Sequence, residues 1–326
     1  MRSHVDVTDP HLTALRALVQ VREQVRDVLT LQLVAFPQEG IVSFDGGEKL
    51  LEEAVRLGVD VVGAIPHYED TREDGIRSVE IAVDLAARHG LRVDAHCDEI
   101  DDEQSRFVEV LATLAHRTGL RSRVTASHTT AMGSYNAAYS YKLRRILARS
   151  GINVVSNPMV NLHLQGRFDG YPKRRGLTQV KELLAAGVNV AFGHDDVMDP
   201  WFPLGTADPC QIALVGALAN QLTAPAEIAE CYRAVTDRAA RVLGVEDRGL
   251  PAGGGPVSAE RSCTTCTISW TTSGSASRSP PYDQAEVTSP AAATVAHEMV
   301  ALMARGARCE TGQTLAEGMF SIPDNV

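Results

Sequence analysis

Several features that mark particular classes of protein are missing from this sequence. Cysteine is scarce, with six residues in 326, and so few in a chain of this length do not make a disulfide framework. No apolar run approaches the length that a membrane-spanning helix requires. The first residues, Met1–Val7, have no signal-peptide arrangement. Together these absences predict a cytoplasmic protein with reduced thiols.

Positive charge is also in short supply. The chain has 31 Lys and Arg against 41 Asp and Glu, which gives a formal net charge of -10. This balance argues against a nucleic-acid backbone or an anionic membrane as partner. Hydrophobic residues make up 44% and charged residues 22%, which is ordinary for a soluble globular protein. We therefore expect one large domain with an appendage, acting on a small molecule.

Apolar strand-like segments alternate with helical segments along most of the chain. The expected strands lie near residues 3–8, 30–36, 59–65, 91–96, 123–128, 152–156 and 188–193. The expected helices cover about 12–28, 48–57, 77–88, 103–117, 136–149, 179–186, 210–222 and 226–243. Since the strands read as buried on both faces, the alternation predicts an α/β fold with a parallel sheet.

Such a fold is either a doubly wound sheet or a closed barrel. No Gly-x-Gly-x-x-Gly follows any strand, which argues against the dinucleotide-binding form of the doubly wound sheet. Candidate chemical residues follow several different strands instead, which is typical of a (β/α)8 barrel. Seven expected strands are one short of eight, and Met1 stands directly before the first of them. We therefore expect a TIM-type barrel without its first strand, which would lie upstream.

The composition changes after the last expected helix. The segment 250–256 is rich in Gly and Pro, and residues 258–279 are rich in Ser, Thr and Cys without clear periodicity. We therefore expect two regions. Residues 1–250 would form the barrel with strands 2–8, and residues 251–326 would form a divergent or poorly ordered C-terminal tail.

Three expected strands end in His, or in His with Asp. These ends carry His96, His128 and the pair His194-Asp195, and Glu99 lies just beyond His96. A hydrolytic metal site needs His, Asp, Glu or Cys converging from separate elements, with a position open for water. His96 and Asp195 are the best ligand candidates. Glu99 is placed for general acid–base work, and His128 would bind the metal or hydrogen-bond its water. Each of these histidines alone is better explained as a hydrogen-bonded side chain near a strand end. The three histidines together with Glu99 and Asp195 favour an active site.

Three further residues are candidates for binding a planar polar substrate. Gln38 offers both a donor and an acceptor, the pair needed to read an amide-like ring edge, or it is an ordinary turn residue. Trp201 would stack on a ring, or would pack beneath the last loop. Asp196 would accept a hydrogen bond from an exocyclic amine, or would cap a helix.

Motifs in this order resemble the bacterial cytosine deaminases of the amidohydrolase superfamily. The resemblance runs from about residue 2 to residue 254 and is specific. It rests on Phe-Pro-Gln-Glu-Gly at 36–40, His-Cys-Asp-Glu-Ile-Asp-Asp-Glu-Gln-Ser at 96–105, Ser-His-Thr-Thr-Ala-Met at 127–132, Asn-Leu-His-Leu-Gln-Gly-Arg-Phe-Asp at 161–169 and Gly-His-Asp-Asp-Val at 193–197. It implies a distorted (β/α)8 barrel with a small β-sandwich made from both chain ends.

The resemblance also implies a reaction, the hydrolysis of cytosine to uracil and ammonia in pyrimidine salvage. His96 and Asp195 would hold one divalent metal ion, Fe2+ or Zn2+, that lowers the pKa of the attacking water. Glu99 would move protons to the ring nitrogen and the leaving amine, and His128 would orient and polarise the water. Asp195 would take up the proton of the water.

The resemblance also implies that Gln38 would hydrogen-bond the amide edge of the pyrimidine substrate. Asp196 and Trp201 would border the pocket near the amine and the ring. A free nucleobase is the implied partner, and assembly into a homo-oligomer is common in the family.

One family feature is missing. The family's first barrel strand carries a His-x-His pair that supplies two metal ligands, and this sequence has no His-x-His; His4 matches the second strand. Alternatives therefore stay open. One is a related ring-amine hydrolase acting on creatinine, isocytosine or an s-triazine, and another is an inactive truncated remnant. A third is a metal-free structural α/β domain.

Overall fold

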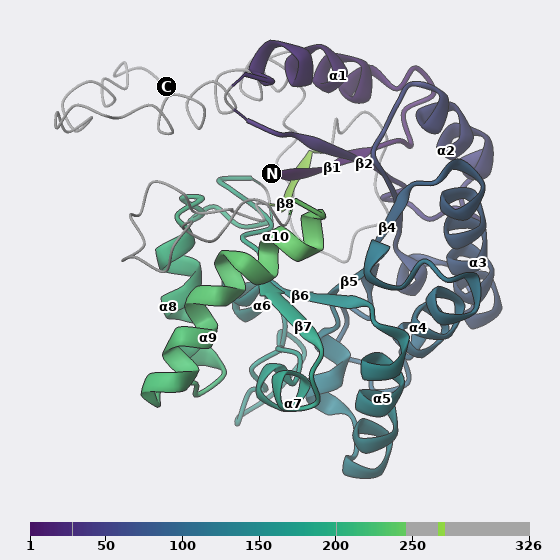
Figure 1. Ribbon diagram of the computed structural model, residues 1–326. Coiled ribbons are helices and arrows are strands. Elements are labelled where there is room, and N and C mark those ends of the chain that lie inside the picture. The colour runs from purple at the N-terminus through teal and green to yellow at the C-terminus, as the bar shows by residue number, and fades with distance from the viewer. Residues whose placement is uncertain (28, 200, 246–266, 271–326) are drawn as a thin grey trace, which may run out of the picture.

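The computed structural model describes residues 1–27, 29–199, 201–245 and 267–270. Its strands form one sheet in the order β7-β6-β5-β4-β3-β2-β1-β8, and every neighbouring pair is parallel. They are β1 (Arg2–Asp6), β2 (Gln32–Phe36), β3 (Val61–Ala64), β4 (Arg92–Cys97), β5 (Val124–His128), β6 (Asn153–Ser156), β7 (Asn189–Phe192) and β8 (Thr267–Trp270). No ladder joins β7 to β8 within the described residues, so there the sheet is curved but not closed (Figure 1).

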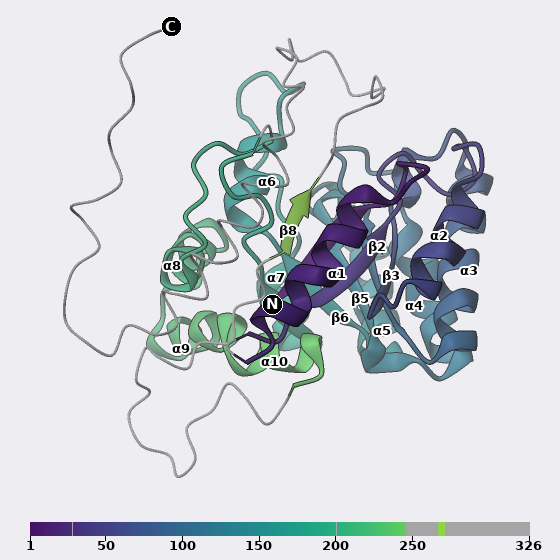
Figure 2. The ribbon, with the colours of Figure 1, turned by 90° about the horizontal axis from the view of Figure 1, so that it is seen from above.

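Helices follow the strands along the chain and cover the outer side of the sheet (Figure 1). They are α1 (Thr13–Val25), α2 (Gly47–Arg56), α3 (Arg72–His89), α4 (Phe107–Thr118), α5 (Ala137–Ser150), α6 (Pro158–Leu164), α7 (Val180–Ala185), α8 (Pro209–Ala219), α9 (Pro225–Val235) and α10 (Asp237–Leu243), with short 3-10 turns at Pro66–Tyr68, Arg121–Arg123 and Thr130–Ser134. In both ribbon views α8 and α9 lie together, on the other side of the sheet from α2 and α3 (Figure 2). No helix among the described residues is long and apolar enough to cross a membrane.

Local sequence explains where the helices begin and end. Thr71 and Asn136 cap α3 and α5, each accepting a hydrogen bond from a backbone N–H of the first turn. Gly90 and Gly119 follow α3 and α4 with φ of 67° and 75°, a left-handed conformation that glycine adopts without strain. These caps set the lengths of the helices and so return the chain to the start of each following strand.

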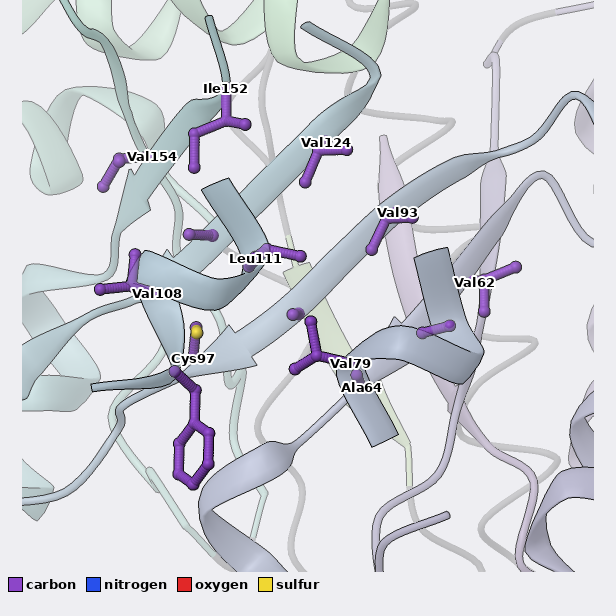
Figure 3. Close-up of a cluster of buried hydrophobic side chains, with 14 of the residues drawn as sticks. Val62, Ala64, Val79, Val93, Cys97, Val108, Leu111, Val124, Ile152 and Val154 are labelled. Carbon is purple, nitrogen blue, oxygen red and sulfur yellow. The ribbon is translucent and has the colours of Figure 1, made fainter. Parts of the chain in front are cut away.

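The two faces of each strand have different chemistry. On β4, Val93, Ala95 and Cys97 are fully buried and alternate with Asp94 and His96. Figure 3 shows Val93 and Cys97 packed with residues of α3 and α4, including Val79 and Leu111. The apolar face therefore binds the helices, and the polar side chains of β4 point into the interior of the curved sheet.

The prediction of a parallel α/β barrel fold is confirmed, and all seven expected strands are present within two residues of their expected positions. The sequence did not predict β8, which pairs with β1 on the side where the first strand was expected to be missing. Of the predicted tail, 251–326, only β8 is described, so the rest of that prediction lies outside the described residues. The division into 1–250 and 251–326 stays a prediction.

Several helix boundaries differ from the prediction. α3 begins five residues earlier than expected because Thr71 provides the cap, and α4 begins later because residues 98–106 form a turn. The expected helix over 226–243 is two helices that meet at Thr236, whose backbone (φ -122°, ψ -100°) is not helical. Helix α6, which lies next to the candidate site, was not predicted.

A buried ion pair holds the interior of the sheet together. Arg2 of β1 is fully buried, and its Nη1 lies 2.6 Å from Asp94 Oδ2 of β4. The second Asp94 oxygen accepts from Ser127 Oγ at 2.6 Å, and Arg2 Nη2 donates to the Val242 carbonyl of α10 at 3.0 Å. Burial alone would raise the pKa of Asp94, but Arg2, His4 and the hydrogen bond from Ser127 hold it well below its usual range. One interaction network thus joins β1, β4, β5 and α10.

We predict that Arg2→Met destabilises the fold by about 3–5 kcal/mol, because it leaves the Asp94 charge buried without a partner. Equilibrium urea unfolding followed by circular dichroism measures the change. Arg22→Met is the matched control, since Arg22 pairs with a half-exposed Asp60 at 2.9 Å and its loss should cost about 1 kcal/mol or less. Equal losses in the two variants would contradict the role given to the buried pair.

Candidate active site

The side chains predicted to carry chemistry gather at the C-terminal end of the sheet. His96 of β4 and His128 of β5 are buried, with ring centroids 4.4 Å apart. His128 Nδ1 lies 2.8 Å from Glu99 Oε1, and its Nε2 lies 3.6 Å from Asp195 Oδ2. The structure thus brings four predicted residues together from the ends of three strands.

The chain leaves these strand ends through conformations that are unusual for residues with a side chain. φ is 57° at Asp98, 69° at His128 and 69° at Asp195. The left-handed region costs a non-glycine residue about 1–2 kcal/mol. Such a conformation persists only where the surrounding contacts enforce it. Each of the three strand ends is therefore held in place by its neighbours.

Asp98 shows how one of these turns is enforced. Its carboxylate is fully buried and accepts from Ser105 Oγ at 2.7 Å and from the backbone N–H groups of Phe107 and Val108 at 2.9 Å. Its carbonyl oxygen accepts from the Ala131 N–H at 3.0 Å. These bonds fix the chain directly before Glu99. The sequence reasoning assigned no role to Asp98, although it lies inside the motif at 96–105.

Three side chains form a cluster that can hold a metal ion. One ligand atom each from His96, Glu99 and His128 lies within 4.8 Å of the other two. His96 Nε2 is buried and has no hydrogen-bond partner, so its lone pair is available to a cation. Burial lowers the pKa of His96 well below its ordinary value, which keeps the ring neutral. Nitrogen and carboxylate donors fit a divalent ion such as Zn2+ or Fe2+. Asp195, predicted as a ligand, lies beside this trio against His128.

The charges in the site depend on one another. Burial alone would lower the pKa of His128, but Glu99, Asp195 and Asp94 outweigh it and raise this pKa to about 9. Burial raises the pKa of Asp195 to about 7, and Glu99 adds to the effect. Burial would also raise the pKa of Glu99, but His128 beside it lowers it on balance. The geometry therefore favours a Glu99 carboxylate paired with a protonated His128.

Further rings enclose His96 on the inner side of the sheet. The centroids of His4 and Phe36 lie 4.6 and 4.3 Å from that of His96. Both ring nitrogens of His4 are buried without a hydrogen bond, and Nε2 lies 3.8 Å from Asp94. Burial lowers the pKa of His4, and burial lowers that of His67 to about 4. The sequence reasoning gave His4 no chemical role and did not single out His67.

Two asparagines that the sequence reasoning missed also contact the site. Asn161 of α6 donates from Nδ2 to Glu99 Oε1 at 3.0 Å, and this nitrogen lies 3.1 Å from His128 Nδ1. Asn157, just before α6, places its Nδ2 3.2 Å from His128 Nε2. Asn161 opens one of the family motifs, which was the available signal. It was missed because α6 is short and was not predicted.

The predicted substrate residue Gln38 lies in the turn after β2. The turn is held by the buried Glu69, whose Oε1 accepts from the Ile41 N–H at 2.7 Å and whose Oε2 accepts from the Ser43 N–H at 2.8 Å. No hydrogen bond or ion pair joins Gln38 to Glu99 within the described part of the chain. The structure places Gln38 on a fixed turn at the same end of the sheet.

Asp196 and Trp201 lie in the loop that follows β7. Asp196 is buried, and burial together with Asp195 and Asp199 raises its pKa well above the ordinary value. Trp201 is half-buried, and its backbone N–H donates to Asp199 Oδ1 at 3.0 Å. Both predicted residues thus belong to one loop that starts at Asp195.

The chain is similar to known hydrolases. A family model described as "Amidohydrolase family" matches residues 7–256. A pterin deaminase of Rhizobium rhizogenes is 31% identical over 259 residues, which are 78% of this chain and 58% of that protein. An N-isopropylammelide isopropyl amidohydrolase of a Pseudomonas species is 27% identical over 247 residues, which are 75% of this chain and 58% of that one. The chain therefore spans little more than half the length of these curated relatives.

A solved structure shares more of the sequence. The 5-methylcytosine deaminase of Klebsiella pneumoniae, liganded with 5-fluorocytosine, is 52% identical with a TM-score of 0.74. The match covers 76% of this chain and 60% of that one. An N-isopropylammelide isopropylaminohydrolase of Burkholderia multivorans is 28% identical with a TM-score of 0.64, over 74% of this chain and 59% of that one. The likeness thus covers about three quarters of this chain in both structures.

The pKa shifts at the site predict how the stability of the metal-free protein depends on pH. Asp195 (about 7) and His128 (about 9) both bind protons more tightly in the folded chain than in the unfolded one, where their pKa values are about 3.9 and 6.5. Folding stability should therefore fall as pH rises, through Asp195 between about pH 4 and 7 and through His128 between about 6.5 and 9.

After dialysis against a chelator, the free energy of urea unfolding should be lower at pH 9 than at pH 6, by a difference of order 2 kcal/mol. His128→Gln should lose most of this difference, and His116→Gln, at an exposed position of α4, should keep it. Greater stability at pH 9 than at pH 6 in the unsubstituted chain would contradict the proposed charge state of His128.

Proposed function

The chain belongs to the amidohydrolase family, and we propose that it hydrolyses the exocyclic amine of cytosine, or of its 5-methyl derivative, to give the 4-oxo pyrimidine and ammonia. One observation carries this proposal. The cluster of His96, Glu99 and His128 lies in a chain that is 52% identical to a deaminase of 5-methylcytosine. Similarity to relatives that act on other amino-substituted rings supports the same reaction class.

His96 and Asp195 would hold the metal, with His128 and Glu99 at its side. The neutral ring and unpaired Nε2 of His96 fit this role. Iron and zinc are the proposed ions. When bound, the ion supplies a Lewis acid that makes water a nucleophile near neutral pH.

The remaining steps would fall to the side chains. Protonated His128, held between Glu99 and Asp195, would orient and polarise the attacking water. Asp195, as a carboxylate beside the ion, would accept the proton that the water loses. Glu99 would carry a proton to the ring nitrogen and then to the amine, which leaves as ammonia. Asn161, which donates a hydrogen bond to Glu99 Oε1, would keep this carboxylate oriented toward the substrate while it exchanges protons.

Substrate orientation would come from the turn after β2 and the loop after β7. Gln38 would donate to and accept from the amide edge of the pyrimidine. Asp196 would contact the amine, and Trp201 would lie against the ring. Glu69 fixes the backbone of the turn that carries Gln38, and Asp199 fixes that of the loop that carries Trp201. The substrate would therefore meet preorganised groups on both segments.

A second candidate is a related hydrolase of a larger or different ring. The 31% identity to a pterin deaminase and the similarity to isopropylammelide hydrolases favour this alternative over creatinine or isocytosine. An inactive remnant is the remaining alternative, and it predicts neither metal binding nor turnover.

The first test measures amine release by protein whose metal content is determined in the same preparation. The amine is ammonia from cytosine, 5-methylcytosine and pterin, and isopropylamine from N-isopropylammelide. We expect about one ion per chain and the highest kcat/KM with cytosine or 5-methylcytosine. Glu99→Gln should lower kcat by about a hundredfold or more, because it removes the general acid–base group.

Glu103→Gln is the matched control, since Glu103 is exposed on the same acidic segment and should keep the activity of the unsubstituted chain. Turnover of pterin alone would support the second candidate. Absence of both bound metal and amine release would support the inactive remnant, and activity that survives Glu99→Gln would contradict the mechanism.

A further inference from the structure

The predicted motif at 193–197 contains one imidazole that the proposed mechanism does not use. His194 is fully buried at the end of β7. Its Nε2 accepts a hydrogen bond from the Thr206 backbone N–H at 3.2 Å. Because Nε2 is the acceptor, the ring proton lies on Nδ1, which donates to the Asp196 carbonyl oxygen at 2.8 Å. Both ring nitrogens are therefore used to hold backbone.

These two bonds join the beginning and the end of one loop. The loop starts at Asp196 and returns at Thr206, and both ends meet on the His194 ring. Gly205 packs directly against the ring, since a Cβ there would lie 2.6 Å from His194 Cε1 and 2.5 Å from the Asp196 carbonyl oxygen. The Phe202 ring lies 6.4 Å from the imidazole, centroid to centroid. His194 is thus the point around which the loop closes.

The tip of the loop is a separate, locally stabilised turn. Asp199 Oδ1 accepts from the backbone N–H groups of Trp201 and Phe202 at 3.0 and 2.9 Å. The backbone bond from the Asp199 N–H to the Phe202 carbonyl is long, at 3.4 Å. The turn carries Trp201, and the neighbouring Phe202 side chain is buried in the hydrophobic core. The two bonds to His194 hold the backbone at both ends of the loop and so add to the placement of Trp201.

We propose that His194 is a positioning residue for the substrate-binding loop, and that its two nitrogens have separable effects. The Nδ1 bond supports the left-handed turn at Asp195 and so holds the Asp195 carboxylate, the proposed metal ligand, in place. The Nε2 bond anchors the far end of the loop and so fixes the position of Trp201. The kinetic part rests on the proposed function, whereas the placement of Trp201 does not.

The test separates the two nitrogens by substitution. His194→Asn keeps a donor near the position of Nδ1 and loses the acceptor for Thr206. His194→Ala loses both bonds. The chain has two tryptophans, so a Trp270→Phe background makes Trp201 the single reporter. Acrylamide quenching of its fluorescence, the metal content, and KM and kcat for cytosine and 5-methylcytosine are then compared.

We expect His194→Asn to increase the quenching constant of Trp201 at least twofold and KM about tenfold, the effect of losing one hydrogen bond, with kcat within threefold and metal content unchanged. His194→Ala should show these changes together with a loss of bound metal. His163→Asn is the matched control. Its ring also contacts Phe202, at 5.6 Å, but spans neither end of the loop, so quenching and KM should stay within twofold.

Quenching and KM in His194→Asn that equal those of His163→Asn would overturn the proposal, as would a change in melting temperature alone. If the unsubstituted chain releases no ammonia from any substrate, the proposed function fails. The comparison of Trp201 quenching still decides whether His194 positions the loop.

Discussion

The buried ion pair of Arg2 and Asp94 joins β1 to β4 in the interior of the curved sheet. Two buried charges 2.6 Å apart are tolerable only when hydrogen bonds satisfy their remaining atoms, and Ser127 and the Val242 carbonyl provide them. Asp94 stands two residues before His96 on the same face of β4. A shift of one residue would turn both outward and place Val93 inside, so the ion pair also fixes the register that presents His96 to the site.

At the C-terminal end of the sheet, the site residues follow or occupy left-handed backbone positions, and buried polar groups hold this strained backbone in place. Asp98 is fixed by hydrogen bonds to the start of α4, and the turn at Asp195 by the ring of His194. In each case the supporting residue is the direct neighbour of the one given a chemical role, Glu99 or Asp195. A left-handed turn sends adjacent side chains in different directions, so one neighbour can bind the scaffold while the other enters the site.

The sequence predicted what depends on local pattern and missed what depends on distant partners. Buried parallel strands read as continuous apolar runs, so β1 to β7 and the residues at their ends could be found. α6 is a short helix that begins with Pro158 and has no clear apolar period, so Asn161 was missed. β8 gave no signal because its pairing with β1 joins residues more than 260 positions apart. Asp98 and His194 stood within recognised motifs, but their backbone partners are set by tertiary structure.

The balance of charge in the site explains why these residues suit a cation. Burial raises the pKa values of Asp195, Asp196 and Asp199, and neighbouring carboxylates raise those of Asp195 and Asp196 further. Protonated His128 offsets this negative charge only in part. A divalent ion beside His96 would supply the missing positive charge and return Asp195 to its ionised form, the form that can accept a proton from water. In the proposed mechanism, ion binding and proton acceptance would thus be coupled through the Asp195 carboxylate. The hydrogen bond from His194 to the Asp196 carbonyl would then serve the mechanism by holding the backbone at Asp195 in place.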